Sequence, residues 1–307
     1  MFLLIGIAKV NSIHKISIIF IKNIYKSVSA MKKLLLSLLF FILPLLMFSQ
    51  SICFSKKDEM QLMASNKSFI KSHALPKAYH HISKAGGVMV EFNTPDGTMA
   101  KGFYIPAAKP TPYTLFVFQE WWGLNDHIKR EAEHLYSTLG NVNVLALDMY
   151  DGKIATTREE AGKYMGSASP ARLEAIIQGA ISYAGPKAKI ATVGWCFGGA
   201  LSLKASILVG KQAAACVMYY GMPVKDVEQL KLLQTDVLGL FAGKEKFISP
   251  QVVKEFEENM KLAGKKLSLK SFDADHGFAN PSNPIYNAAA TEEAWNMAIA
   301  YFKTKLK

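Results

Sequence analysis

Residues 189–209, KIATVGWCFGGALSLKASILV, decide the fold. The first five form a short, mostly apolar and partly β-branched run, as in a buried strand, and residues 198–209 have the apolar spacing of a helix. Between them, residues 194–199 (GWCFGG) predict a tight turn, because Gly194 and Gly198 leave room for a strained backbone. A strand, such a turn and a helix are typical of a nucleophile elbow, here with cysteine in place of serine. We expect the sulfur of Cys196 to stand above the sheet, at the helix end that favours a thiolate.

A simpler interpretation of this turn is a buried cysteine in an ordinary strand-to-helix connection. Short motifs match by chance, and on these six residues alone the simpler interpretation is preferred. The remainder of the chain reverses that preference.

Strand and helix patterns alternate on both sides of this stretch. The expected strands are residues 88–92, 99–106, 114–118, 142–147, 189–193, 213–220, 237–241 and 267–272. The expected helices are about 126–139, a short one after the capping box at 157–160, 170–184, 198–209, 250–263 and 291–305. This alternation predicts an α/β fold with a mostly parallel sheet and helices on both faces.

Charge and cysteine content exclude some classes of protein. The net charge is +12, but the first 50 residues contain six lysines and no acid, which leaves +6 for the rest. Without basic runs, that surplus gives no case for a nucleic-acid partner. Cys53, Cys196 and Cys216 are too few for a disulfide framework, and Cys216 lies in an apolar run typical of a core.

The N-terminal 50 residues have the pattern of a leader. Met31 is followed by two lysines, an apolar run and a polar exit, which predicts a signal peptide over about residues 31–50 if translation starts at Met31. Pro44 and the short apolar run argue against a permanent membrane span. We therefore expect export to the periplasm or medium, with membrane contact only through the leader. Lipidation of Cys53 is disfavoured by the large Ile52. Residues 51–86 are expected to form an arm on a domain of residues 87–307.

Two further polar residues follow strands at the positions that a catalytic triad requires. Glu245 comes just after the strand 237–241, and His276 comes just after the strand 267–272. With Cys196 as nucleophile, His276 would be the base, and Glu245 would accept its Nδ1 proton while Nε2 faces the sulfur. A solvated loop acid is the alternative reading of Glu245. The rival acids are Asp226, Asp236, Asp273 and Asp275.

These motifs, in this order, resemble the dienelactone hydrolases, cysteine members of the α/β-hydrolase fold. The resemblance covers about residues 88–302 and rests on residues 119–125 (QEWWGLN), 148–150 (DMY), 194–199 (GWCFGG) and 276–278 (HGF). It implies that Glu120 holds the resting thiol and helps to charge it. It also implies that the backbone N–H groups of Trp121 and Phe197 form an oxyanion hole. The alternative readings are a helix-capping acid at Glu120 and packing aromatics at Trp121 and Trp122.

The sequence departs from the family pattern at two places. Glu245 stands where the family usually has aspartate, and Asn280 stands where it has an arginine that fixes the substrate carboxylate. Arg158 is a loose match to a second such arginine. Because a bidentate carboxylate clamp is lost, dienelactone itself is a doubtful substrate. We place Trp122, Arg158 and Asn280 in the substrate-binding region and expect an apolar or aromatic acyl group.

The resulting prediction is a lactone or carboxylic ester hydrolase that works through a cysteine acyl-enzyme, with a small-molecule substrate and no cofactor or metal. The first alternative is a non-catalytic, exported small-molecule-binding protein that keeps the fold. The second is a redox-active thiol protein, which the lack of a Cys-x-x-Cys motif disfavours. The sequence leaves the oligomeric state open.

Overall fold

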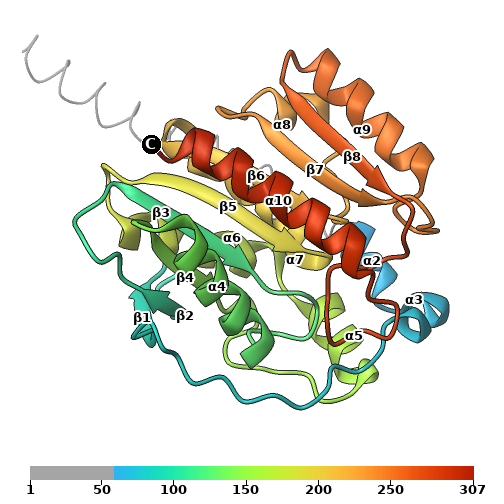
Figure 1. Cartoon of the computed structure of the whole chain (residues 1–307), viewed down its shortest axis with the longest axis horizontal. Coiled ribbons are helices and arrows are strands. Elements are labelled where there is room, and N and C mark those ends of the chain that lie inside the picture. Colours follow the sequence, from blue (N-terminus) through green and yellow to red (C-terminus); the bar gives the residue numbers. More distant parts are fainter. Residues whose placement is uncertain (1–58) are drawn as a thin grey trace, which may run out of the picture. The chain divides into compact units, whose positions relative to one another are not determined.

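The computed structural model describes residues 59–307, which fold around one eight-stranded sheet (Figure 1). The strand order is β1-β2-β4-β3-β5-β6-β7-β8. The pairs β1–β2 and β2–β4 are antiparallel, and all the other pairs are parallel. The strands are β1 (Val88–Asn93), β2 (Met99–Ile105), β3 (Tyr113–Phe118), β4 (Asn143–Leu147), β5 (Lys189–Trp195), β6 (Ala213–Tyr219), β7 (Val237–Ala242) and β8 (Leu267–Phe272).

The central strands are buried because helices cover both faces of the sheet. In β3, every residue after Tyr113 is buried, and all six residues of β7 are buried. Such continuous apolar runs are characteristic of parallel strands that meet no solvent on either side. The predicted α/β architecture with a mostly parallel sheet is confirmed.

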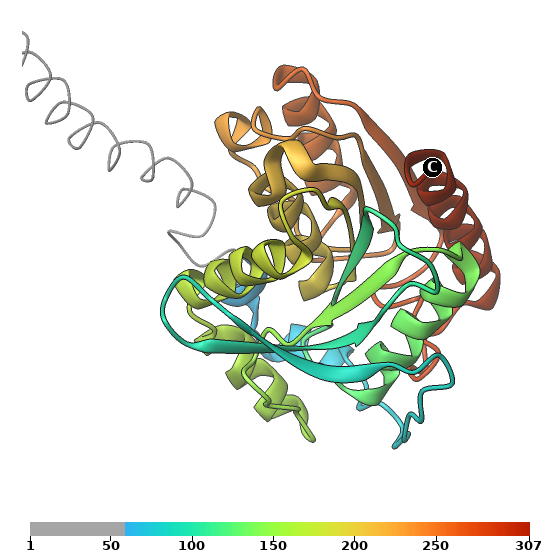
Figure 2. The same ribbon diagram turned by 90° about the vertical axis from the view of Figure 1, so that its left-hand side faces the viewer.

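Helices α4 and α10 contact each other on one face of the sheet, and α6 and α7 pack together on the other face (Figure 2). Asn125, Ser169, Ser249 and Asn287 cap the first turns of α4, α6, α9 and α10 through their side-chain oxygens. The helices of this domain are α4 (Asp126–Leu139), α5 (Arg158–Ser167), α6 (Pro170–Ala184), α7 (Phe197–Val209), α8 (Val227–Leu230), α9 (Pro250–Leu262) and α10 (Ala288–Lys305), with a short 3₁₀ turn at Gly210–Gln212.

The arm expected over residues 51–86 contains two short helices in its described part, α2 (Glu59–Met63) and α3 (Lys67–Ser72). Both contact α5, and they lie beside it in Figure 1. Met60 and Phe69 are fully buried, so these helices contribute to the hydrophobic core. Residues 59–73 are called the N-terminal cover below.

The predicted leader, Cys53 and residues 51–58 lie outside the described residues. Among residues 59–307, no helix combines the length and the apolar character that a membrane span requires.

Candidate active site

The turn between β5 and α7 has the geometry of a nucleophile elbow. Cys196 has φ 56°, a left-handed conformation that non-glycine residues rarely adopt, and it directly precedes α7. A Cβ atom on Gly194 would lie 2.1 Å from the carbonyl oxygen of Gly198, and one on Gly198 would lie 2.4 Å from that of Phe118. Only glycine fits at both positions. The strain at Cys196, typically about 1–3 kcal/mol, is maintained by the packing of the strand and the helix.

The sulfur of Cys196 is enclosed. The residue is only 1 % exposed. Burial raises the pKa of its thiol, while the nearby His276 and the backbone N–H of Phe197 act in the opposite direction. The neutral thiol is therefore favoured until a neighbouring base takes its proton.

His276 and Glu245 form a buried pair beside the sulfur. Nδ1 of His276 contacts Oε2 of Glu245. Although burial opposes the charged imidazole, Glu245 and Cys196 together hold the pKa of His276 well above its ordinary value. Burial likewise opposes the charge on Glu245, but the facing His276 keeps the pKa of that carboxyl below its ordinary value. Nε2 of His276 is buried and has no hydrogen-bond partner within residues 59–307.

The four rival acids have other roles. Asp226 caps α8, and Asp236 pairs with Lys305 at 2.8 Å. Asp273 pairs with Lys244 at 3.2 Å at the surface, and Asp275 is exposed. Glu245 is thus the acid that contacts the imidazole.

Glu120 lies deep in the site, and its carboxyl group is held by Asn280. Nδ2 of Asn280 donates a hydrogen bond of 2.7 Å to Oε2 of Glu120. Burial raises the pKa of Glu120 to about 7, against the opposing effects of His276 and the Asn280 hydrogen bond. In the structure Glu120 is hydrogen-bonded to Asn280, and the role at the thiol that the family resemblance implies stays a prediction. The two residues border a small hollow of about 30 Å³ that Arg130 and Trp195 also line.

The two expected oxyanion-hole residues follow β3 and Cys196. Phe197 begins α7, and its N–H lies against the sulfur. Trp121 is fully buried and its ring lies 5.0 Å from that of Trp122, which is also buried. Trp121 packs against the rings of Phe69 and His73 at the site, and Trp122 packs behind it against Trp121.

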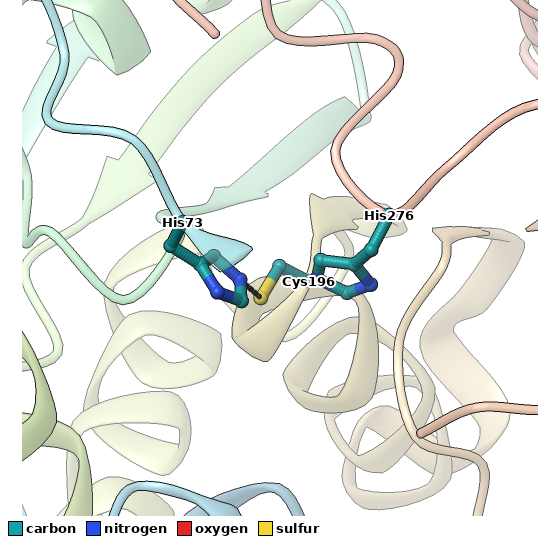
Figure 3. A group of neighbouring side chains, drawn as sticks. All are labelled: His73, Cys196 and His276. Atoms are coloured by element: carbon teal, nitrogen blue, oxygen red, sulfur yellow. Dashed lines mark hydrogen bonds between the residues drawn. The ribbon is translucent and has the colours of Figure 1, made fainter. Parts of the chain in front are cut away.

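His73 also reaches the site, and sequence reasoning did not select it. Figure 3 shows His73 and His276 on opposite sides of Cys196. Nε2 of His73 lies 3.8 Å from the sulfur of Cys196, and Nδ1 lies 2.7 Å from the carbonyl oxygen of Phe69. Burial lowers the pKa of His73 to about 3, and the charge of His276 adds to that effect. His73 is therefore neutral, donates Nδ1–H to Phe69 and presents the lone pair of Nε2 to the thiol.

The N-terminal cover closes the site over the sulfur. The Phe69 ring packs edge-on against Trp121 and Phe247, with centroids 5.6 Å and 5.3 Å away, and the ring of His73 lies 4.5 Å from Trp121. Nε of Arg158 donates a hydrogen bond to the carbonyl oxygen of His73. In this closed arrangement Arg158 anchors the cover; its placement in the substrate-binding region stays a prediction.

One cluster among the described residues could hold a metal ion. Ligand atoms of His73, Cys196 and His276 all lie within 4.8 Å of one another, and all three residues are buried.

Comparison with known proteins identifies the family. The sequence profile described as "Dienelactone hydrolase family" matches residues 101–306. The chain belongs to the dienelactone hydrolase family. Its α/β-hydrolase fold agrees with a putative dienelactone hydrolase from Klebsiella pneumoniae, at a TM-score of 0.61 and 21% identity over 71% of this chain and 98% of that one.

Two relatives of this dienelactone hydrolase family member align with most of the chain. A putative carboxymethylenebutenolidase of Aquifex aeolicus is 27% identical over 234 residues, 72% of this chain and 100% of the relative. The protein usf of Aquifex pyrophilus is 28% identical over 233 residues, 72% of this chain and 99% of the relative. These relationships support a hydrolase of the dienelactone hydrolase type and do not favour the non-catalytic alternative.

Proposed function

We propose that the protein hydrolyses a lactone or carboxylic ester through an acyl-enzyme on Cys196. The observation that carries this proposal is the buried His276–Glu245 pair beside a cysteine that a left-handed turn holds at the start of a helix. A nucleophile, a base and a group that orients the base are the parts that covalent acyl transfer needs.

The first half of the reaction forms the acyl-enzyme. Nε2 of His276 takes the proton of the Cys196 thiol, and the thiolate attacks the substrate carbonyl carbon. The carbonyl electron pair moves to oxygen, which accepts hydrogen bonds from the N–H groups of Trp121 and Phe197. Loss of one such donor typically costs about 3 kcal/mol of transition-state stabilisation. The tetrahedral intermediate expels the alcohol oxygen, which takes the proton from His276.

The second half releases the acid. His276 removes a proton from water as the oxygen attacks the thioester, and the proton then returns to the sulfur as the C–S bond breaks. Glu245 keeps the proton on Nδ1 throughout, so that Nε2 faces the reacting atoms. Trp121 and Trp122 favour a substrate with an apolar or aromatic acyl group.

The resting site is closed, so the reaction also requires an opening step. His73 and Phe69 occupy the space above the sulfur, and the substrate carbonyl needs that space. Withdrawal of the N-terminal cover from Trp121 would admit the substrate and free the thiol from His73.

Pre-steady-state kinetics with p-nitrophenyl acetate and a panel of aryl lactones tests this function. We expect a burst of nitrophenol equal to the enzyme concentration, followed by slower turnover, because deacylation follows a completed acylation. Cys196→Ser should remove the burst. Cys216→Ser is the matched control, because Cys216 is a buried core thiol on β6 and should leave the burst intact. A burst that survives in Cys196→Ser would overturn the proposal.

A further inference from the structure

We propose that the closed site binds one Zn²⁺ ion through Nε2 of His73, Sγ of Cys196 and Nε2 of His276. The bound ion would tie the N-terminal cover to the nucleophile and stop turnover. The inhibitory effect rests on the proposed function, whereas metal binding stands independently of it.

The three side chains lie close together (Figure 3), and all three residues are buried. A tetrahedral zinc ion with bonds of about 2.3 Å to sulfur and about 2.0 Å to nitrogen separates sulfur from nitrogen by roughly 3.5 Å and the two nitrogens by roughly 3.3 Å. The sulfur of Cys196 already lies 3.8 Å from Nε2 of His73. The remaining separations lie within 4.8 Å, so shifts of at most about 1.5 Å would complete the triangle.

Both imidazoles are oriented as metal-binding histidines usually are. Such histidines donate the second ring N–H to a carboxylate or a backbone carbonyl, which fixes the free nitrogen on the metal. His276 directs Nδ1 to Glu245, and His73 directs Nδ1 to the carbonyl oxygen of Phe69. The orientation of His276 is also the one that the proposed hydrolysis requires. The proposed hydrolysis does not require the orientation of His73.

Nε2 of His276 provides an independent indication. It is a buried ring nitrogen that faces the cluster and has no hydrogen-bond partner in the described part of the chain. Buried polar atoms normally have a partner, so this one points to a ligand at the cluster.

The charge and chemistry of the donors suit a borderline-soft divalent ion. One thiolate and two neutral imidazoles are a set that zinc accepts, with a fourth position left for water. The thiolate and the Glu245 carboxylate together offset the double charge of the ion. Binding releases one proton, the one shared by the Cys196–His276 pair, while each imidazole keeps its Nδ1 proton.

The test is titration of the full-length protein with Co²⁺ as a spectroscopic substitute for Zn²⁺, followed by competition with Zn²⁺. We expect one equivalent to bind with a thiolate-to-cobalt charge-transfer band and the visible bands of a tetrahedral ion. Cys196→Ser should abolish the charge-transfer band. His73→Ala should weaken binding about tenfold or more, because one of three ligands is lost.

His80→Ala is the matched control, because His80 follows the same N-terminal segment and its side chain is 82 % exposed. This variant should bind Co²⁺ as the parent does. Near-ultraviolet circular dichroism and a second variant, His73→Gln, distinguish ligand loss from misfolding. Absence of the charge-transfer band in the parent, or equal affinities of folded His73→Ala and His80→Ala, would overturn the proposal. A parent that binds the ion as expected but never hydrolyses an ester would instead overturn the proposed function.

Discussion

Cys196 lies between two imidazoles whose surroundings shift their pKa values in opposite directions. Burial, aided by the charge of His276, lowers the pKa of His73 to about 3 and keeps it neutral. His276 is equally buried, but the Glu245 carboxylate behind it holds its pKa well above the ordinary value. Only an imidazole that can carry a proton during the reaction can act as the base, so this role falls to His276. His73 acts as a hydrogen-bond acceptor for the resting thiol.

The first prediction at this scale concerns the carboxylate. Glu245→Gln should lower kcat by about 100-fold or more, because the neutral amide no longer stabilises the imidazolium or fixes the tautomer. Steady-state kinetics with an aryl ester gives the comparison. Asp273→Asn serves as the control, because Asp273 lies near His276 in sequence but pairs with Lys244 at the surface. Equal losses in the two variants would show that Glu245 has no special role.

The second prediction concerns the pH dependence of stability at Glu120. Its pKa in the folded protein is about 7, above the ordinary value of 4.5. Between these two values the folded state binds more protons than the unfolded state, so this group makes the protein less stable as pH rises from 4.5 to 7. Glu120→Gln has no carboxyl group to titrate at this position, so it should not show this decrease in stability with rising pH.

The measurement is the difference in Tm between Glu120→Gln and the parent across this pH range. We expect the difference to shift in favour of the variant as pH rises, and to level off above pH 7. Parallel Tm curves for the two proteins would show that Glu120 titrates normally.

At the scale of elements, the N-terminal cover is the feature that the sequence predicted least well. Its helices have five and six residues, too few for the apolar periodicity that identifies a longer helix. Two residues could have indicated a helix here: Asn66, which caps α3, and Phe69, the apolar residue that α3 buries. The position of His73 beside Cys196 depends on how the cover packs against Trp121 and Arg158. Local sequence carries no information on such a distant contact.

The third prediction tests the cover as the barrier to the sulfur. Phe69→Ala should raise the rate of Cys196 alkylation by iodoacetamide on the order of tenfold or more, because loss of a buried phenylalanine costs about 3 kcal/mol or more of packing. Peptide mass spectrometry gives the rate at this residue. The control is Leu62→Ala in α2, because Leu62 is 62 % exposed. An unchanged rate in Phe69→Ala would mean that the sulfur is reached by another route.

The fourth prediction concerns the junction of β3 with the elbow. Gly198→Ala would place a Cβ atom 2.4 Å from the backbone oxygens of both Phe118 and Gln119, which cannot move without disturbing β3. We expect a loss of about 3 kcal/mol or more in the free energy of unfolding, measured with urea. In the control Gly166→Ala, the new Cβ meets the Cβ of Ala64 at 3.1 Å and the backbone oxygen of Gln61 at 3.8 Å, so a much smaller change should result. Similar losses in both variants would contradict the close-approach explanation.

The longer strands and helices could be predicted from the sequence because each one shows its apolar pattern over its whole length. The expected strands agree with the observed ones to within one or two residues, since β3, β5 and β7 are mostly apolar and almost entirely buried. Helix α10 begins at Ala288, three residues earlier than expected, because Asn287 provides the cap. The four-residue helix α8 was not predicted.

At the scale of the whole molecule, the site depends on several strands at once. Glu120 follows β3, Cys196 follows β5, Glu245 follows β7 and His276 follows β8. Because these strands are parallel, their carboxyl ends lie at one edge of the sheet, where α/β folds bind their ligands. Chain order and strand position therefore sufficed to select Cys196, Glu245 and His276. They did not predict the Glu120–Asn280 pair, which depends on the path of the loop after β8.

The positive charge of the whole chain is unevenly distributed. Half of the formal net charge of +12 comes from the first 50 residues, where residues 31–50 have the pattern of a signal peptide. Export of the remaining chain stays a proposal based on that pattern. N-terminal sequencing of the mature protein would test it.

The central claim is that the sulfur of Cys196 carries the acyl group during turnover. The most direct measurement is rapid acid quenching of the enzyme with a slowly deacylated aryl ester, followed by intact-mass and peptide mass spectrometry. The account predicts one acyl group per chain, located on Cys196 and absent from Cys196→Ser. Turnover of the ester with no adduct, or with an adduct on another residue, would contradict it.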